Sequence, residues 1–162
     1  MPDEPRDRIG PEDLDRLLAF LVQHDASDIT IQTDEKIYAE IYGVLYQTTK
    51  RKISKNEVSF LLNSIYGANG TTQLSSGQDL DTYYEFRPSR VERYRFRVNA
   101  TACLVEGYTG IQITMRSIPT TPPKLVDMAL PQNIIDNIAP LEGAVYVTGA
   151  TGSGKSTLLA SI

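Results

Sequence analysis

The sequence is poor in the residues that build redox and transition-metal sites. Its 162 residues include one cysteine, Cys103, one histidine, His24, and no tryptophan. A lone cysteine cannot form a disulfide within the chain, which fits a reducing compartment such as the cytosol. With one histidine and no cluster of cysteine and histidine, the sequence also offers no transition-metal site.

Long apolar runs are absent as well. No stretch approaches the length that spans a bilayer, and Met1 to Arg8 are charged and proline-bearing rather than an apolar targeting core. The composition, 41% hydrophobic and 22% charged with a formal net charge of -4, is typical of a soluble protein. We therefore expect a cytoplasmic chain without a transmembrane segment, in which residues 1–10 form a disordered lead-in.

The strongest pattern present is a phosphate-binding loop. The spacing of Gly149, four residues and then Gly154-Lys155-Ser156 matches a loop whose backbone N–H groups surround a polyphosphate. Lys155 is the expected catalytic charge donor to the β and γ phosphates, and the Ser156 hydroxyl is the expected Mg²⁺ ligand. The residues expected to bind the nucleotide are Gly149, Ala150, Thr151, Gly152, Ser153, Gly154, Lys155, Ser156 and Thr157.

The flanking sequence favours this interpretation over a glycine-rich turn that binds nothing. An apolar, β-branched run from Gly143 to Thr148 predicts a strand, and Ser156 to Ala160 predicts a helix start whose positive end faces the anion. Seven residues follow Lys155. We therefore expect a fragment cut inside the first helix of a nucleotide-binding domain. It should be inactive alone, because Mg²⁺ also needs a carboxylate from a later strand.

Hydrophobic periodicity predicts helices and strands before this loop. Pro11 to about Gln23 has helical spacing of leucines, and Ser27 to Gln32 alternates like a strand. A second strand is expected from Ile37 to Tyr46, with Leu45 on its core face. Ser54 and Glu57 form a capping box for a helix ending near Tyr66, after which a polar loop is expected through Gly77.

Three antiparallel strands should follow, over Asp79–Phe86, Tyr94–Cys103 and Gly110–Arg116. The period of two places Arg93, Arg95 and Arg97 on the face opposite the core, and Arg116 shares that register. Prolines then predict a semi-rigid linker. The expected organisation is a domain over 11–118, a linker over 119–130, and the start of a nucleotide-binding domain over 131–162.

Several runs resemble the secretion ATPases, which power type II and type IV secretion, pilus movement and conjugation. Ala26–Ile31 resembles the family's Ala-Ser-Asp segment, Asp79–Glu85 its acidic strand and Arg95–Ala100 its arginine strand. Met115–Pro119 resembles the strand before its linker, and Val147–Thr157 resembles its phosphate loop. Together they span nearly the whole chain. Within the family, residues 93–123 most resemble the DotB-like and conjugative TraJ-like ATPases of type IVB systems.

The resemblance implies an α+β, PAS-like N-terminal domain with an antiparallel sheet and helices, followed by the truncated start of a RecA-like α/β domain. It implies a hexameric homo-oligomer that hydrolyses ATP with Mg²⁺ and powers a type IV secretion system. Such a motor lies peripherally at the inner membrane, on secretion-channel components. The resemblance also implies that N-terminal arginines reach a neighbouring subunit's ATP. It does not fix which ones; Arg97 and Arg116 are our candidates, and pairing with Asp79, Asp81 or Glu85 at the surface is the alternative.

Other functions remain open. One is a non-catalytic docking or scaffold subunit that uses nucleotide to set its oligomeric state. Another is a motor for a type IV pilus or type II secretion. Against pilus retraction, Glu40 stands where retraction members usually carry arginine, three residues before Gly43. A nucleic-acid surface made of Arg87, Arg90, Arg93, Arg95 and Arg97 is disfavoured by the acidic chain, so we expect no specific nucleic-acid binding.

Overall fold

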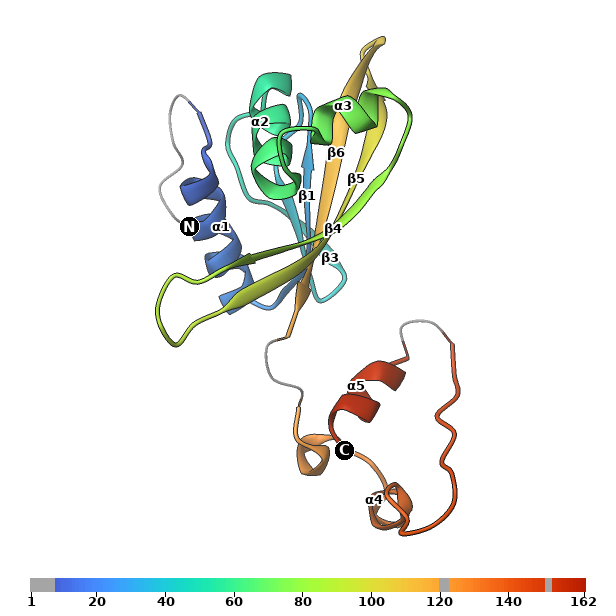
Figure 1. Ribbon diagram of the computed structural model, residues 1–162. Coiled ribbons are helices and arrows are strands. Elements are labelled where there is room, and N and C mark those ends of the chain that lie inside the picture. The colour runs from blue at the N-terminus through green and yellow to red at the C-terminus, as the bar shows by residue number, and fades with distance from the viewer. Residues whose placement is uncertain (1–7, 120–122, 151–152) are drawn as a thin grey trace. The chain divides into compact units, whose positions relative to one another are not determined.

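A six-stranded antiparallel sheet forms the centre of the N-terminal part of the chain in the computed structural model (Figure 1). Its strand order is β3-β2-β1-β6-β5-β4. The strands are β1 Ala26–Gln32, β2 Tyr38–Ile41, β3 Val44–Gln47, β4 Leu80–Phe86, β5 Tyr94–Val105 and β6 Tyr108–Ile118. This sheet with its helices confirms the expected α+β class, whereas the PAS-like and RecA-like assignments stay predictions.

The structure describes residues 8–119, 123–150 and 153–162. The chain divides into two units, Met1–Ile118 and Pro119–Ile162. The expected lead-in falls largely on residues 1–7, and part of the expected linker on 120–122, which lie outside the described residues.

Helix α1, Pro11–Gln23, forms as its sequence predicts. The Asp13 carboxylate accepts a hydrogen bond from the Gly10 N–H at 2.9 Å, which satisfies one end donor of the helix. The leucines at helical spacing are buried against the sheet, together with residues of β1, β5 and β6: Leu14, Leu17, Leu18, Leu21, Ile29, Ile31, Phe96, Ile113 and Met115. This shared core lies on one face of the sheet.

The prediction of one strand from Ile37 to Tyr46 is wrong, because this segment forms two strands, β2 and β3. The chain instead turns at Tyr42 and Gly43, whose φ values are 51° and 78°, and forms the β2–β3 hairpin. Two consecutive residues with positive φ are the mark of a type I′ turn, which suits the right-handed twist of the paired strands. The turn also takes Leu45 out of the core, so that 67% of it is exposed.

Helix α2, Lys55–Tyr66, begins at the predicted capping box of Ser54 and Glu57. The loop expected after it is only partly correct, because a short helix, α3, spans Gly70–Ser75. Its sequence has weak helix propensity. Tertiary contacts hold it instead, since Leu74 is buried and the Thr71 N–H donates to Asn63 Oδ1 at 3.1 Å.

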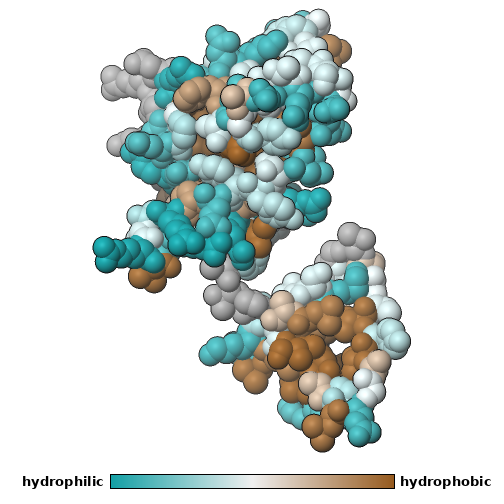
Figure 2. Space-filling view, in the orientation of Figure 1, coloured by the Kyte–Doolittle hydropathy of each residue, from teal (hydrophilic) through white to brown (hydrophobic). Residues whose placement is uncertain are grey.

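The unit Pro119–Ile162 contains a 3₁₀ turn, η1 Leu125–Asp127, and two short helices, α4 Gln132–Asn137 and α5 Lys155–Ala160. The strand expected over Gly143–Thr148 does not form, because none of the described residues supplies a strand to pair with it. Figure 2 shows apolar side chains gathered on the surface of this unit. The exposed apolar residues include Ile134, Leu141, Val145 and Leu159.

Candidate functional site

The predicted phosphate loop lies between the extended run after Gly143 and helix α5. Gly154 adopts φ 84° immediately before Lys155, the first residue of α5. A residue with a Cβ is strained in this left-handed conformation, so glycine allows the chain to enter the helix here. Thr151 and Gly152, two of the predicted binding residues, lie outside the described residues.

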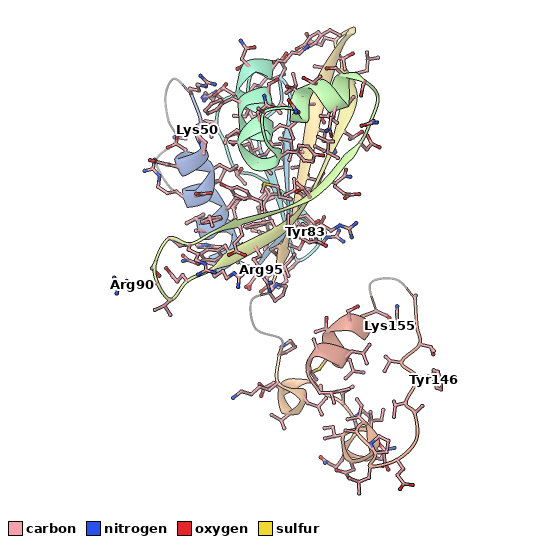
Figure 3. The ribbon with its side chains drawn as sticks, viewed as in Figure 1. Lys50, Tyr83, Arg90, Arg95, Tyr146 and Lys155 are labelled. Atoms are coloured by element: carbon pink, nitrogen blue, oxygen red, sulfur yellow. The ribbon has the colours of Figure 1, made fainter. Side chains whose placement is uncertain are left out.

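The Lys155 side chain folds back over its own loop (Figure 3). Its Nζ donates hydrogen bonds to the carbonyl oxygens of Gly149, at 2.8 Å, and Ala150, at 2.5 Å. The loop is also tight around Gly149, where an added Cβ would lie 2.8 Å from Ser153 Oγ. The Lys155 ammonium group therefore lies over the start of the loop, within reach of a phosphate group that the loop would bind.

Ser156 and Thr157 occupy the second and third positions of α5, and both are exposed. Their hydroxyls are therefore open to a bound group. The described ranges contain no cluster of three or more His, Cys, Asp or Glu side chains that would hold a metal by themselves. The exposed Ser156 hydroxyl fits the role of a ligand for Mg²⁺ that a bound nucleotide would carry.

The two candidate arginines lie side by side on the open face of the sheet in the other unit. Arg97 of β5 is directly opposite Arg116 of β6. Both side chains are largely exposed, 64% for Arg97 and 71% for Arg116. Two like charges in directly opposed positions repel each other. An anionic ligand bound between Arg97 and Arg116 would offset this repulsion.

Each arginine also has a carboxylate neighbour. Arg116 Nε donates to Asp28 Oδ1 at 2.8 Å, and an Arg97 terminal nitrogen lies 3.7 Å from Asp81 Oδ1. The Arg97 pair agrees with the surface alternative. Asp28 was not among the partners expected for Arg116. Only the pairing of β1 with β6 reveals this contact, because it places Asp28 directly opposite Arg116. The Arg97–Asp81 pair is exposed on both sides and contributes little stability, whereas only 17% of the Asp28 side chain is exposed.

The other arginines of the expected basic face have different surroundings. Arg93 lies 2.5 Å from Glu85 Oε2. That contact, with Arg87 beyond it, lowers the pKa of Glu85 although partial desolvation opposes the shift. Arg95 Nε is buried and finds no hydrogen-bond partner in the described part of the chain. Arg97 and Arg116 therefore stand out from this set as an adjacent, accessible pair.

Solved structures of two ATPases superpose on this chain over nearly its whole length. The structure of the ATPase DotB from Legionella pneumophila is 64% identical and superposes with a TM-score of 0.90, covering 99% of this chain and 43% of that chain. The DotB structure from Yersinia pseudotuberculosis is 30% identical, with a TM-score of 0.85 and coverage of 99% and 44%. The resemblance to the secretion ATPase family is confirmed.

A curated relative of this chain is the type IV pilus retraction ATPase PilT of Pseudomonas aeruginosa. It is 27% identical over 151 residues, which cover 93% of this chain and 41% of PilT. No protein-family model matches the chain. The chain thus spans less than half the length of the relatives that it matches. Among the described residues, no helix combines the length and the apolar character that a membrane span needs.

Proposed function

We propose that this chain is the N-terminal domain and the start of the ATPase domain of a motor that powers a type IV secretion system, of the type IVB, Dot/Icm-like or conjugative kind. The observation that carries the proposal is the phosphate loop, with Lys155 held over Gly149 and Ala150. The likeness to two DotB ATPases supports the type IVB assignment. In this proposal the protein is a cytoplasmic hexamer that docks on channel components at the inner membrane.

ATP would be hydrolysed at this loop by transfer of its γ-phosphoryl group to water, and the Ser156 hydroxyl would be a ligand for Mg²⁺. Lys155 would exchange its two carbonyl partners for phosphate oxygens, because an ammonium group bonds more strongly to an anion than to a neutral acceptor. The backbone N–H groups of residues 149–157 would orient the phosphates. The 162-residue chain by itself should not hydrolyse ATP, since no described strand supports residues 144–148.

Replacing Lys155 tests the proposal. We expect Lys155→Ala in the full-length protein to lower the rate of ATP hydrolysis at least 100-fold and to stop secretion, because a preorganised charge contact is lost. Lys124→Ala, which removes another lysine of the same unit, should leave hydrolysis unchanged. Steady-state phosphate release measures both, with circular dichroism to verify folding. A folded Lys155→Ala protein with normal hydrolysis would contradict the assignment of this loop as the site of ATP hydrolysis.

We further propose that Arg97 and Arg116 act on ATP bound to the phosphate loop of a neighbouring subunit. Guanidinium groups bind phosphate oxygens through two parallel N–H donors, and these two arginines stand adjacent on an open face. A surface ion pair is worth less than about 1 kcal/mol, whereas an arginine finger contributes about 10³-fold or more to the rate. The two roles therefore differ strongly in their effect on turnover.

Mixing two inactive full-length variants separates these roles. An Arg97→Ala subunit keeps its loop, and a Lys155→Ala subunit keeps its arginines, so a mixed ring contains some sites with both groups. We expect hydrolysis to reappear in the mixture and not in either variant alone; Arg116→Ala is tested in the same way. Near-normal turnover of the arginine variants alone would exclude the role in trans.

A pilus motor is the second candidate, because PilT is among the relatives. Glu40, where retraction motors usually carry arginine, argues against it. Complementation distinguishes the two: the full-length gene should restore secretion to a strain lacking a type IVB ATPase, and should not restore twitching to a strain lacking PilT.

A further inference from the structure

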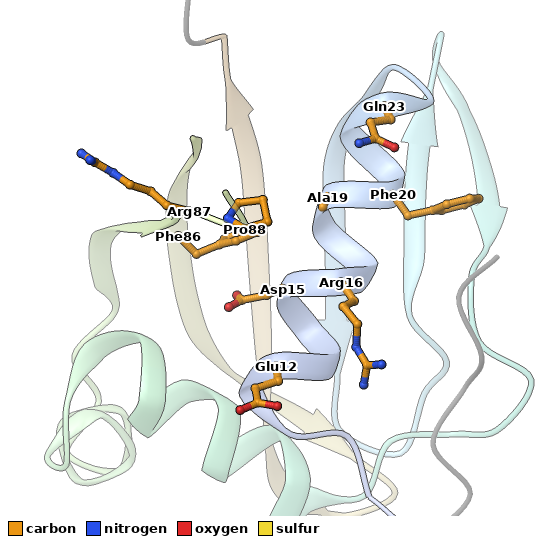
Figure 4. A pocket seen from close by; sticks show the side chains of 9 residues that line it. All are labelled: Glu12, Asp15, Arg16, Ala19, Phe20, Gln23, Phe86, Arg87 and Pro88. Carbon is orange, nitrogen blue, oxygen red and sulfur yellow. The ribbon is translucent and has the colours of Figure 1, made fainter. Parts of the chain in front are cut away.

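A groove of about 790 Å³ lies between helix α1 and the end of strand β4 (Figure 4). On the helix it is lined by residues that recur every three to four positions and so form one stripe: Glu12, Asp15, Arg16, Ala19, Phe20 and Gln23. Phe86, Arg87 and Pro88 form the opposite wall. Figure 4 shows the small Ala19 side chain facing Phe86 and Pro88. The groove exists because alanine occupies the middle of the stripe.

Two hydrogen bonds fix the spacing between helix α1 and the neighbouring strands β4 and β5. Tyr84 Oη donates to Asp15 Oδ1 at 2.7 Å, and Gln23 Nε2 donates to Tyr94 Oη at 3.2 Å. Asp15 and Gln23 lie on either side of Ala19 and are roughly 12 Å apart along the helix at its rise of 1.5 Å per residue. These contacts connect α1 to both β4 and β5. The groove is therefore part of the folded framework rather than a gap between loosely attached segments.

The strand wall is apolar and stiff. The Phe86 ring stacks on Tyr94 with ring centroids 5.4 Å apart, and it lies nearly parallel to Phe96 at 6.3 Å. Phe96 is itself fully buried in the core. Such a supported aromatic surface favours the packing of an apolar side chain against it.

Two arginines line the groove, one on each wall, but neither pairs with the carboxylates of the helix wall. Arg16 pairs with Asp13 and Arg87 pairs with Glu85, and in Figure 4 the Arg87 side chain points away from the gap. In the described part of the chain, no cation pairs with Glu12 or Asp15. Burial raises the pKa of Asp15, opposed by its hydrogen bond from Tyr84 and reinforced by Glu12. A positive charge placed between the two carboxylates would be favourable here.

We propose that this groove binds an extended segment of a partner protein in which a lysine or arginine lies beside an apolar residue. The cation would lie between Glu12 and Asp15, and the apolar side chain would pack on Phe86 above Ala19. The lining from Glu12 to Gln23 extends roughly 16 Å along the helix, which matches about five residues of extended chain. An elongated groove with an acidic end and an aromatic wall suits a peptide rather than a compact ligand. This site does not depend on ATP hydrolysis.

Selection from a random peptide library tests the proposal, because the peptides that bind the chain reveal which sequences the groove prefers. The 162-residue chain is immobilised and presented with phage displaying random 12-residue peptides, and the library is first depleted on Glu12→Gln/Asp15→Asn. We expect enriched peptides to share a lysine or arginine next to a leucine, isoleucine, valine or aromatic residue. Failure to enrich any peptide over the depleting variant would overturn the proposal. A consensus without a basic residue would overturn it as well.

The enriched consensus peptide, labelled with fluorescein, then serves as the probe for fluorescence anisotropy. Its affinity should fall at least tenfold for Glu12→Gln/Asp15→Asn, which keeps an acceptor for the Tyr84 hydroxyl, and also for Ala19→Trp, which fills the groove without changing its charge. Asp79→Asn/Glu106→Gln, a control with the same change in net charge elsewhere, should bind normally. If the control lost as much affinity for the peptide as the double variant, the peptide would bind elsewhere. An unchanged affinity for a folded Ala19→Trp protein would lead to the same conclusion. Either result would overturn the proposal.

Discussion

At the scale of single residues, Glu57 joins three segments of the N-terminal unit. Its carboxylate accepts hydrogen bonds from the Ile9 N–H at 2.9 Å, from the Ser54 N–H and hydroxyl, and from two Arg51 nitrogens at 2.6 and 3.1 Å. Only 5% of the residue is exposed. Burial alone would raise the pKa of Glu57, but Arg51 and the other donors hold it at about 2. The ionised carboxylate is therefore part of the folded structure.

This depressed pKa predicts a loss of stability in acid. The unfolded carboxylate binds its proton near pH 4.5, so the contribution of Glu57 is complete above that pH and declines as the pH falls toward about 2. By linkage, its size is on the order of 3 kcal/mol. We expect the difference in unfolding free energy between the wild type and Glu57→Gln, measured by urea denaturation, to shrink from pH 6 to pH 2. A difference independent of pH would show that the charge is not responsible.

At the scale of elements, the β2–β3 hairpin shows how a two-residue turn changes the environment of the residues after it. Tyr42 Oη donates to Asp25 Oδ2 at 2.6 Å, which ties the turn to the end of α1. Ile37 and Ala39 before the turn are fully buried, whereas all four residues of β3 are exposed. The alternation of β3 therefore carries no information about the core.

The hairpin depends on the backbone freedom of Gly43. Its φ is 78°, and an added Cβ would meet nothing within 4 Å, so any effect of substitution comes from backbone strain. We expect Gly43→Ala to destabilise the chain by about 1 kcal/mol, and Gly43→Asn by less, because asparagine tolerates this region better. Thermal unfolding followed by circular dichroism measures both. Equal effects of alanine and asparagine would contradict the turn conformation.

At the scale of the molecule, the two units differ in how much apolar surface they bury. The first has a continuous core of 22 buried hydrophobic residues. In the described part of the second, Ile138 is the single buried hydrophobic residue, while Val145, Tyr146 and Leu159 are exposed. A segment that buries so little apolar surface does not offset the entropy of ordering its chain.

Hydrogen exchange should report this difference directly. We expect amides of β1, β5 and β6 to be the most protected in the 162-residue chain, and amides of residues 123–162 to exchange at least 100-fold faster, because they lack a cooperative core. Mass spectrometry after pulse labelling at neutral pH measures both units in one sample. Comparable protection of α5 and β6 would show that the second unit is stabilised by contacts beyond those described.

Local patterns in the sequence predicted the elements whose stability is local. Helix α1 and the start of α2 were found from leucine spacing and the Ser54–Glu57 capping box, and β4, β5 and β6 from alternation. The errors were the β2–β3 turn, helix α3 and the strand expected over Gly143–Thr148. Tyr42 is an unusual residue for positive φ, and α3 depends on Asn63, so neither signal is visible in a short window of sequence.

The sequence by itself predicted the chemistry of the phosphate loop, because the glycines, Lys155 and Ser156 lie close together in the chain and their proposed roles follow from their spacing. It also determined which face of each strand is apolar, through the period of two. Only the tertiary structure decided which charges meet: Asp28 with Arg116, Arg51 with Glu57, and Arg97 beside Arg116. The groove between α1 and β4 likewise exists only in the fold. These contacts join residues distant in the chain, and strand order and register, rather than local sequence, bring them together.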